Sequence, residues 1–244
     1  MKRRTDLEQV KAVAIALLLT DISKTKFSPT VVQHPFTSSG LVPLRKDGQM
    51  QLADITQNED ALIQWQNTMT QMINSATKPF DIYMMVNKPY ALTFLKYASP
   101  YLNSAELGRI LANAWMRSEN PNMDPNVSQN KLVELFRKAD PRYLMDGEEQ
   151  AQLFALNDPV TIYRGVTSLN KSRVRAMSWT LKYDTANWFA HRFNEKGIVY
   201  EAQIEKAHIL ALFNGRNEAE IVVEPTFLVN VQEAEQPYEE ITMS

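Results

Sequence analysis

Apolar residues recur at intervals of three and four along most of residues 1–156, a spacing typical of helices that bury one face. Prolines and polar runs separate these stretches from one another. The clearest apolar stripes are Leu62, Trp65, Met69, Met72 and Ile73, and then Leu107, Ile110, Leu111 and Ala114. The segments predicted to be helical are 5–23, 58–76, 91–98, 105–117, 131–138 and 147–156. Residues 24–50 contain several prolines and glycines, and we predict a loop there with short strands around Val31 and Leu41.

The pattern changes after Asp158 and Pro159, where short apolar runs favour strands. The predicted strands are 160–164, 198–204, 207–213, 219–224 and 226–231. One helix is predicted among them at 184–193, with Asp184 as its cap. Its buried stripe would be Ala186, Phe189, Ala190 and Phe193. We therefore predict an α+β protein with a mainly helical region 1–156, which would serve as a scaffold or select a target. A β-rich region 157–244 would follow and end in an acidic tail.

Successive strand residues point to opposite faces, so Val160, Ile162 and Arg164 share one face of the strand 160–164. An arginine at the end of an apolar strand face can fork onto phosphate oxygens or onto a carboxylate. Gly165, which follows it, allows a ligand to approach the backbone closely. An arginine paired to a structural carboxylate explains the strand equally well.

The segment NEAEIVV at 217–223 places Glu218 and Glu220 on one face of the predicted strand, about 7 Å apart by the strand repeat. Like charges so close repel, which favours a functional role over a stabilising one. A solvent-exposed sheet face is the alternative. The preceding NGRN turn can place Arg216 and Asn217 over a site, and a plain hairpin turn is equally compatible with it.

Ser178 and Thr180 occupy alternating positions of a short extended segment, MSWT, just before the predicted helix 184–193. Their hydroxyls could anchor Arg164 or a catalytic carboxylate. As lone residues they would be unremarkable, and only the other motifs give them weight.

Composition excludes several other chemistries. The sequence has no cysteine, which removes disulfides and thiolate metal sites, and its three histidines lack metal-ligand spacing, so we expect no metal. The seven glycines form neither GxGxxG nor a P-loop. A net charge of −2 argues against nucleic acid as a partner, although a local basic groove is compatible with it. The apolar run 12–19 is short and follows acidic residues, so we predict an amphipathic helix, without export or membrane insertion.

Taken in chain order, Arg164 in YRG, the Ser178-x-Thr180 segment followed by a helix with WFA, and a late E-x-E resemble one family. This is the arginine–serine–glutamate class of mono-ADP-ribosyltransferases, which includes bacterial toxins and enzymes of tailed bacteriophages. The resemblance covers about residues 158–232. The N-terminal part resembles only the helical region that often precedes this fold. Trp179 departs from the serine-rich pattern of that segment, although the outer hydroxyls are kept.

The resemblance implies a fold of two roughly perpendicular β-sheets with NAD in the cleft between them. Arg164 would hold an NAD phosphate or the nicotinamide ribose, and Gly165 would offer its backbone to the nicotinamide amide. Ser178 would orient the site, including Glu220, whose carboxylate would bind the 2′-hydroxyl of the ribose. The implied NAD-binding residues are Arg164, Gly165, Ser178, Thr180 and Glu220, and the implied catalytic residues are Arg164, Ser178, Glu218 and Glu220.

The implied reaction transfers ADP-ribose from NAD to a protein acceptor and releases nicotinamide. Glu218 would bind or deprotonate the acceptor, and E-x-E favours arginine there, since a carboxylate pairs with a guanidinium. Arg216, Asn217 and Glu218 are the expected target-recognition residues. We expect a cytoplasmic monomer whose partners are NAD and a host protein, in the host cytoplasm if a phage encodes it. The alternatives are an NAD glycohydrolase, transfer to or of RNA, and a non-catalytic module on the same fold.

Overall fold

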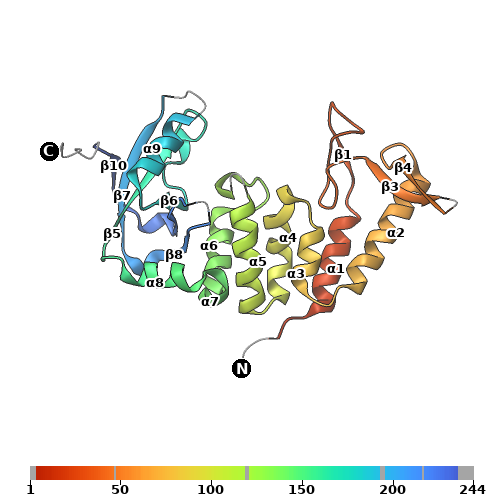
Figure 1. The fold of residues 1–244 in the computed structure, drawn as a ribbon, viewed down its shortest axis with the longest axis horizontal. Helices are drawn as coiled ribbons and strands as arrows, with labels where there is room; N and C mark the ends of the chain where they lie inside the picture. Colours follow the sequence, from red (N-terminus) through yellow and green to blue (C-terminus); the bar gives the residue numbers. More distant parts are fainter. Residues whose placement is uncertain (1–3, 47, 119–120, 193–195, 216, 236–244) are drawn as a thin grey trace, which may run out of the picture. The chain divides into compact units, whose positions relative to one another are not determined.

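The computed structural model describes residues 4–46, 48–118, 121–192, 196–215 and 217–235 (Figure 1). Arg216, Phe193 and most of the acidic tail therefore lie outside the described residues. The chain forms two compact units, which we call the helical unit (residues 1–131 and 138–143) and the sheet unit (residues 132–137 and 144–244).

The boundary between these units lies earlier in the chain than residues 156 and 157, where the composition changes. The helix at 147–155 packs on the sheet of the second unit, because the Asn214 N–H donates to Glu149 Oε1 over 2.8 Å. Met145 also contacts this sheet, with its Sδ 3.2 Å from the Leu212 N–H. Tertiary contacts of this kind cannot be predicted from the amino-acid composition.

Among its described residues before 118, the helical unit has five α-helices and two antiparallel pairs of strands, one of them a hairpin. The helices are α1 (Leu7–Leu18), α2 (Glu59–Ser75), α3 (Pro79–Met85), α4 (Ala91–Ala98) and α5 (Ser104–Arg117). The strands are β1 (Ser23–Lys24), β2 (Val32–Gln33), β3 (Leu41–Lys46) and β4 (Gln49–Asp54), with β3 and β4 forming the hairpin. The later helices are α6 (Gln129–Lys138), α7 (Pro141–Leu144) and α8 (Gly147–Ala155). Short 3₁₀ turns lie at Lys88–Tyr90, Ser99–Tyr101, Pro121–Met123, Lys171–Arg173, Lys206–His208 and Pro225–Phe227.

The core of the helical unit is built as the periodicity predicts for α5 and only partly for α2. All four residues of the α5 stripe, Leu107, Ile110, Leu111 and Ala114, are buried. In α2, Trp65 and Ile73 are buried, but Met72 is 46% exposed, so the prediction of Met72 as a core residue is wrong. The helix contacts α1 and the β3–β4 hairpin.

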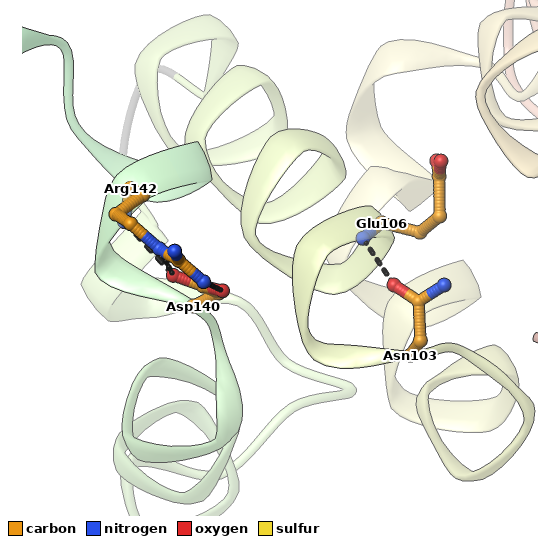
Figure 2. A network of polar contacts seen from close by, with 4 residues as sticks. All are labelled: Asn103, Glu106, Asp140 and Arg142. Carbon is orange, nitrogen blue, oxygen red and sulfur yellow. Dashed lines mark hydrogen bonds and ion pairs between the residues drawn. The ribbon is translucent and has the colours of Figure 1, made fainter. Parts of the chain in front are cut away.

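The start of α5 shows how capping fixes a helix end in this unit (Figure 2). The Asn103 side chain accepts the Glu106 N–H over 2.8 Å. Asn103 gives its own N–H to Thr5 Oγ1 over 3.0 Å, and the Glu106 carboxylate points away from it in Figure 2. A second contact of this unit is the fork between Arg142 and Asp140, with hydrogen bonds of 3.0 and 2.7 Å. The Asp140 N–H also donates to the Ser104 carbonyl over 2.9 Å, which ties residue 140 to the start of α5.

The sheet unit is organised around six antiparallel strands in the order β10–β7–β5–β6–β9–β8. The strands are β5 (Val160–Val166), β6 (Ser178–Thr180), β7 (Ile198–Ile204), β8 (Ile209–Phe213), β9 (Glu220–Val223) and β10 (Val229–Glu233). The α+β class is therefore confirmed. The hydrogen bonds define one sheet where two separate sheets were expected. Its halves, β10–β7–β5 and β6–β9–β8, are joined by the single pair Tyr163↔Thr180.

Helix α9 (Tyr183–His191) packs on β5 through glycine. A Cβ on Gly165 would lie 2.1 Å from the Ala186 carbonyl oxygen, and one on Gly197 would lie 2.2 Å from the Ala190 carbonyl oxygen. Of the predicted stripe, Ala186 and Ala190 are fully buried, Phe189 is only half-buried, and Phe193 lies outside the described residues. The prediction of Asp184 as the cap is wrong, because the N-cap is Lys182, without a side-chain hydrogen bond, and Asp184 lies in the first turn.

Within the part of the chain that the structure describes, no helix has the length and apolar character needed to cross a membrane.

Candidate active site

Arg164, Ser178 and Glu220 are brought into contact where the two halves of the sheet meet. Arg164 lies on β5 opposite Tyr200 of β7, one residue beyond the Tyr163↔Thr180 pair that joins β5 to β6. Among the described residues β5 and β6 share no further pair, and the side chain of Arg164 bridges them here. Its Nη1 donates a hydrogen bond to the Ser178 carbonyl. The arginine thus connects the two halves of the sheet beside their only backbone junction.

The Ser178 hydroxyl makes the next contact. Ser178 pairs with Val222 on β9, and Thr180 pairs with Glu220, so Ser178 and Glu220 are diagonal neighbours on one face. Ser178 Oγ donates to Glu220 Oε1 over 2.5 Å. A hydrogen bond from a hydroxyl to a carboxylate is short and strong, and it fixes the carboxylate in one orientation. The prediction that the Ser178 hydroxyl anchors a carboxylate is confirmed.

Arg164 is a cation in a largely dry environment. Burial lowers its pKa to about 10, while Glu220 acts to raise it and Arg192 acts to lower it. The side chain therefore stays charged at neutral pH. Its Nε is buried and has no hydrogen-bond partner among the described residues. A buried donor without an acceptor costs stability, and an anionic ligand would remove that penalty.

Gly165 has a structural explanation that the sequence did not reveal. Its missing side chain gives space to α9, since a Cβ would lie 2.5 Å from the Ala190 nitrogen and 2.9 Å from Phe189 Cβ. The glycine therefore lets the helix approach the strand that carries Arg164. Contact of the Gly165 backbone with a nicotinamide amide stays a prediction.

Glu218 and Glu220 do not share a strand, which corrects the same-face argument. Strand β9 begins at Glu220, and the residue before it, Ala219, has φ of +44°. A left-handed residue ends the alternation of an extended strand. The E-x-E segment is therefore a turn followed by a strand. Glu218 is half-buried, and within the described residues no hydrogen bond or ion pair occupies its carboxylate.

The Thr180 hydroxyl forms hydrogen bonds with the backbone around this turn, where an anchor for Arg164 or a carboxylate was expected. The residue is 5% exposed, and its Oγ1 donates to the Glu218 carbonyl over 2.5 Å. The same hydroxyl accepts the Lys182 N–H over 3.1 Å. Trp179, the residue that departs from the family pattern, points into the core, where its Nε1 donates to the Ala176 carbonyl over 2.8 Å. The substitution therefore leaves both flanking hydroxyls in place.

The predicted NGRN turn is present, and Asn217 is exposed at its end. The Asn217 N–H donates to the Asn214 carbonyl over 2.7 Å, and Asn217 has φ of +56°. Lys182 Nζ donates to both Asn217 O and Asn217 Oδ1 over 3.1 Å. Lys182 was missed by sequence reasoning, since a lysine after a hydroxyl-rich segment is not distinctive. Arg216, the other expected target-recognition residue of this turn, lies outside the described residues.

An ion pair between the buried Glu224 and the exposed Arg137 supports β9 from its far end. Glu224, 5% exposed, follows the strand and accepts hydrogen bonds from Arg137 Nε, over 2.7 Å, and Arg137 Nη2. A two-pronged contact of this kind fixes both partners. Sequence reasoning missed this pair because its members are far apart in the chain. It anchors the strand that begins with Glu220.

Comparison of the chain with protein-family models, curated proteins and solved structures gives no match. The candidate site therefore stands on its own geometry. In the described ranges no cluster of three or more His, Asp or Glu side chains is placed to hold a metal ion.

Proposed function

We propose that the protein is a mono-ADP-ribosyltransferase that transfers ADP-ribose from NAD to an arginine of a protein acceptor and releases nicotinamide. The observation that carries this proposal is the chain of contacts from Arg164 through Ser178 to Glu220. The three residues come from separate strands, and a purely structural sheet has no need of a half-buried arginine and a half-buried carboxylate joined through a serine. Their types and chain order are those of the family resemblance.

Arg164 is suited to the pyrophosphate or ribose of NAD. It is charged at neutral pH, since its pKa is about 10, and its Nε has no hydrogen-bond acceptor within the described residues. Guanidinium groups bind phosphate oxygens through parallel N–H groups. Nη1 is already held by the Ser178 carbonyl, so the planar group is oriented before a ligand binds. Such preorganisation reduces the entropy lost on binding.

Glu220 is suited to the reacting ribose. Cleavage of the bond between C1′ and nicotinamide leaves positive charge on the sugar, as in glycoside hydrolysis. A carboxylate fixed beside the sugar stabilises that charge more than it stabilises the ground state, and the barrier falls. The nicotinamide ring of NAD is already cationic, so the bonding electrons leave with it and no general acid is required. The hydroxyl of Ser178 would keep Glu220 in place during this step.

Glu218 is suited to the acceptor. Its carboxylate has no hydrogen-bond partner within the described residues, and it belongs to the turn that leads into Glu220. A guanidinium nitrogen that attacks C1′ must lose a proton as the new bond forms. A neighbouring carboxylate can bind the guanidinium and accept that proton.

The test is incubation of the purified protein with NAD labelled in its adenylate part and a bacterial lysate. We expect label on protein, at arginine side chains identified by mass spectrometry, and none with Glu220→Gln. Glu205→Gln, which changes an exposed glutamate outside the site, is the matched control and should behave as the wild type. Free ADP-ribose without labelled protein would instead indicate an NAD glycohydrolase. Label removed by nuclease would indicate a nucleic-acid acceptor, and the absence of NAD binding would indicate a non-catalytic module.

A further inference from the structure

The last residue of β6 and the two residues that follow it hold the three consecutive residues before Glu220. The paired register of β6 and β9 ends at Thr180↔Glu220. Beyond that pair the contacts change, because Ala219 is left-handed. The Leu181 N–H donates to the Ala219 carbonyl over 3.1 Å, and Lys182 Nζ donates to Asn217. The two segments thus stay in contact beyond the end of the paired register, through a backbone hydrogen bond of Leu181 and the side chain of Lys182.

Thr180 is the innermost contact of this set. Its hydroxyl donates to the Glu218 carbonyl over 2.5 Å and accepts the Lys182 N–H over 3.1 Å. The residue is buried, so water does not readily replace either hydrogen bond. Glu218 is a half-buried residue between two residues with positive φ, Asn217 and Ala219. The direction of its carboxylate therefore depends on how firmly this turn is held.

We propose that Thr180 is a positioning residue, whose hydroxyl holds the Glu218 carbonyl and thereby decides whether ADP-ribose passes to a guanidinium or to water. The inference rests on the proposed function. In both outcomes the bond between C1′ and nicotinamide breaks, and its electron pair leaves with nicotinamide. A guanidinium nitrogen or a water oxygen then forms the new bond to C1′. A guanidinium releases its proton to the Glu218 carboxylate and from there to solvent, whereas water releases its proton to solvent directly.

Transfer and hydrolysis should respond differently because the two nucleophiles differ in how precisely they must be oriented. Water is present at high concentration and reaches C1′ from many directions. A guanidinium must be oriented by a carboxylate at the right distance, and displacement of a catalytic group by about 1 Å can reduce a rate on the order of 100-fold. A loosened turn would therefore harm transfer more than hydrolysis.

The experiment uses the full-length protein with NAD and agmatine, a small guanidine compound, as the probe acceptor. The ratio of agmatine transfer to NAD hydrolysis is measured for the wild type, Thr180→Val and Thr180→Ser. Valine keeps the shape of threonine and removes the hydroxyl, whereas serine keeps the hydroxyl. We expect the ratio to fall at least about tenfold with valine and to return to within about twofold of the wild type with serine. The loss should appear in kcat for transfer and in KM for agmatine, and the KM for NAD should change less.

Nicotinamide release into water separates positioning from a general loss of folding. If Thr180 acts through Glu218, Thr180→Val should lower transfer while this release stays within about twofold of the wild type, as Glu218→Gln should also do. Lys182→Met, which loosens the same turn from its exposed side, should lower the ratio in the same direction. An unchanged ratio in Thr180→Val overturns the inference and leaves the proposed function intact. A wild-type protein that releases no nicotinamide overturns both.

Discussion

The Ser178 hydroxyl donates a hydrogen bond of 2.5 Å to Glu220 Oε1 across the β6–β9 pair, and the carbonyl of the same serine accepts from Arg164. One residue therefore holds the cation and the carboxylate of the candidate site at once. Removing its hydroxyl takes this hydrogen bond away from Glu220, while the backbone contact to Arg164 is kept.

Ser178→Ala should lower kcat for nicotinamide release by about 10-fold to 100-fold, because Glu220 loses the group that orients it. The KM for NAD should change little, since Arg164 still has its carbonyl partner. Steady-state kinetics of nicotinamide release measures both quantities. Ser172→Ala, at an exposed serine outside the site, is the control and should match the wild type. A large rise in KM with an unaltered kcat would contradict the orienting role of Ser178.

Glu220→Gln should abolish both NAD cleavage and transfer, by at least about 1000-fold, because the carboxylate that meets the positive charge on the ribose becomes neutral. The fold should be retained, since the amide is nearly isosteric and can accept the same hydrogen bond from Ser178. Thermal unfolding followed by circular dichroism measures the second point. Transferase activity near that of the wild type would show that Glu220 has no part in the chemistry.

Glu218→Gln should remove transfer to arginine compounds while nicotinamide release into water continues. The reason is that Glu218 would take the proton of the acceptor, and cleavage of NAD precedes that step. Chromatography of free ADP-ribose and of ADP-ribosyl agmatine from one reaction gives both rates. Parallel loss of the two products would place Glu218 in NAD cleavage as well.

Binding of ADP-ribose should weaken as the pH rises above about 10, the pKa to which burial lowers Arg164. The ligand binds the protonated guanidinium, so affinity should be constant below that pKa and fall as the proton is lost above it. An arginine whose pKa is not lowered by burial would show no fall in this range. Calorimetric titration at increasing pH measures the change. Arg173→Lys, an exposed control, should keep the wild-type profile, whereas Arg164→Lys should weaken binding at every pH.

Gly165→Ala should destabilise the protein by about 1–3 kcal/mol, because a Cβ there overlaps the backbone of α9. The helix would have to move away from β5, the strand that carries Arg164, so activity should fall together with stability. Urea denaturation measures the free energy of unfolding. Gly147→Ala is the matched control: a Cβ at Gly147 meets nothing within 4 Å, and the change should be neutral or stabilise by up to about 1 kcal/mol.

Sequence periodicity located the regular elements well where local signals agree with the tertiary structure. The strand at 198–204 and the helix at 91–98 have the predicted bounds. Helix α3 was not predicted, because Pro79 reads as a break although it occupies the first turn, where proline is tolerated. Strand 226–231 was predicted too early, since Pro225–Phe227 forms a 3₁₀ turn and β10 begins at Val229.

In the candidate site, too, local sequence patterns predicted some contacts and failed where tertiary contacts decide the backbone geometry. The Ser178–Glu220 contact follows from residue types and chain order, and the structure has it. The geometry of Glu218 could not be predicted, because its turn depends on a left-handed Ala219 that residues 180–182 hold through tertiary contacts. The strand alternation assumed for E-x-E is a local rule, and here distant contacts override it.

The two glycines that face α9 also constrain how related chains can diverge. Gly165 leaves space for the Ala186 carbonyl, and Gly197 leaves space for the Ala190 carbonyl. These oxygens belong to the backbone and are present whatever side chain stands at 186 or 190, so a substitution there cannot make room for a Cβ. Homologues should therefore retain glycine at 165 and 197. Two invariant glycines on either side of a helix would help to identify relatives in addition to the short motifs that surround the site.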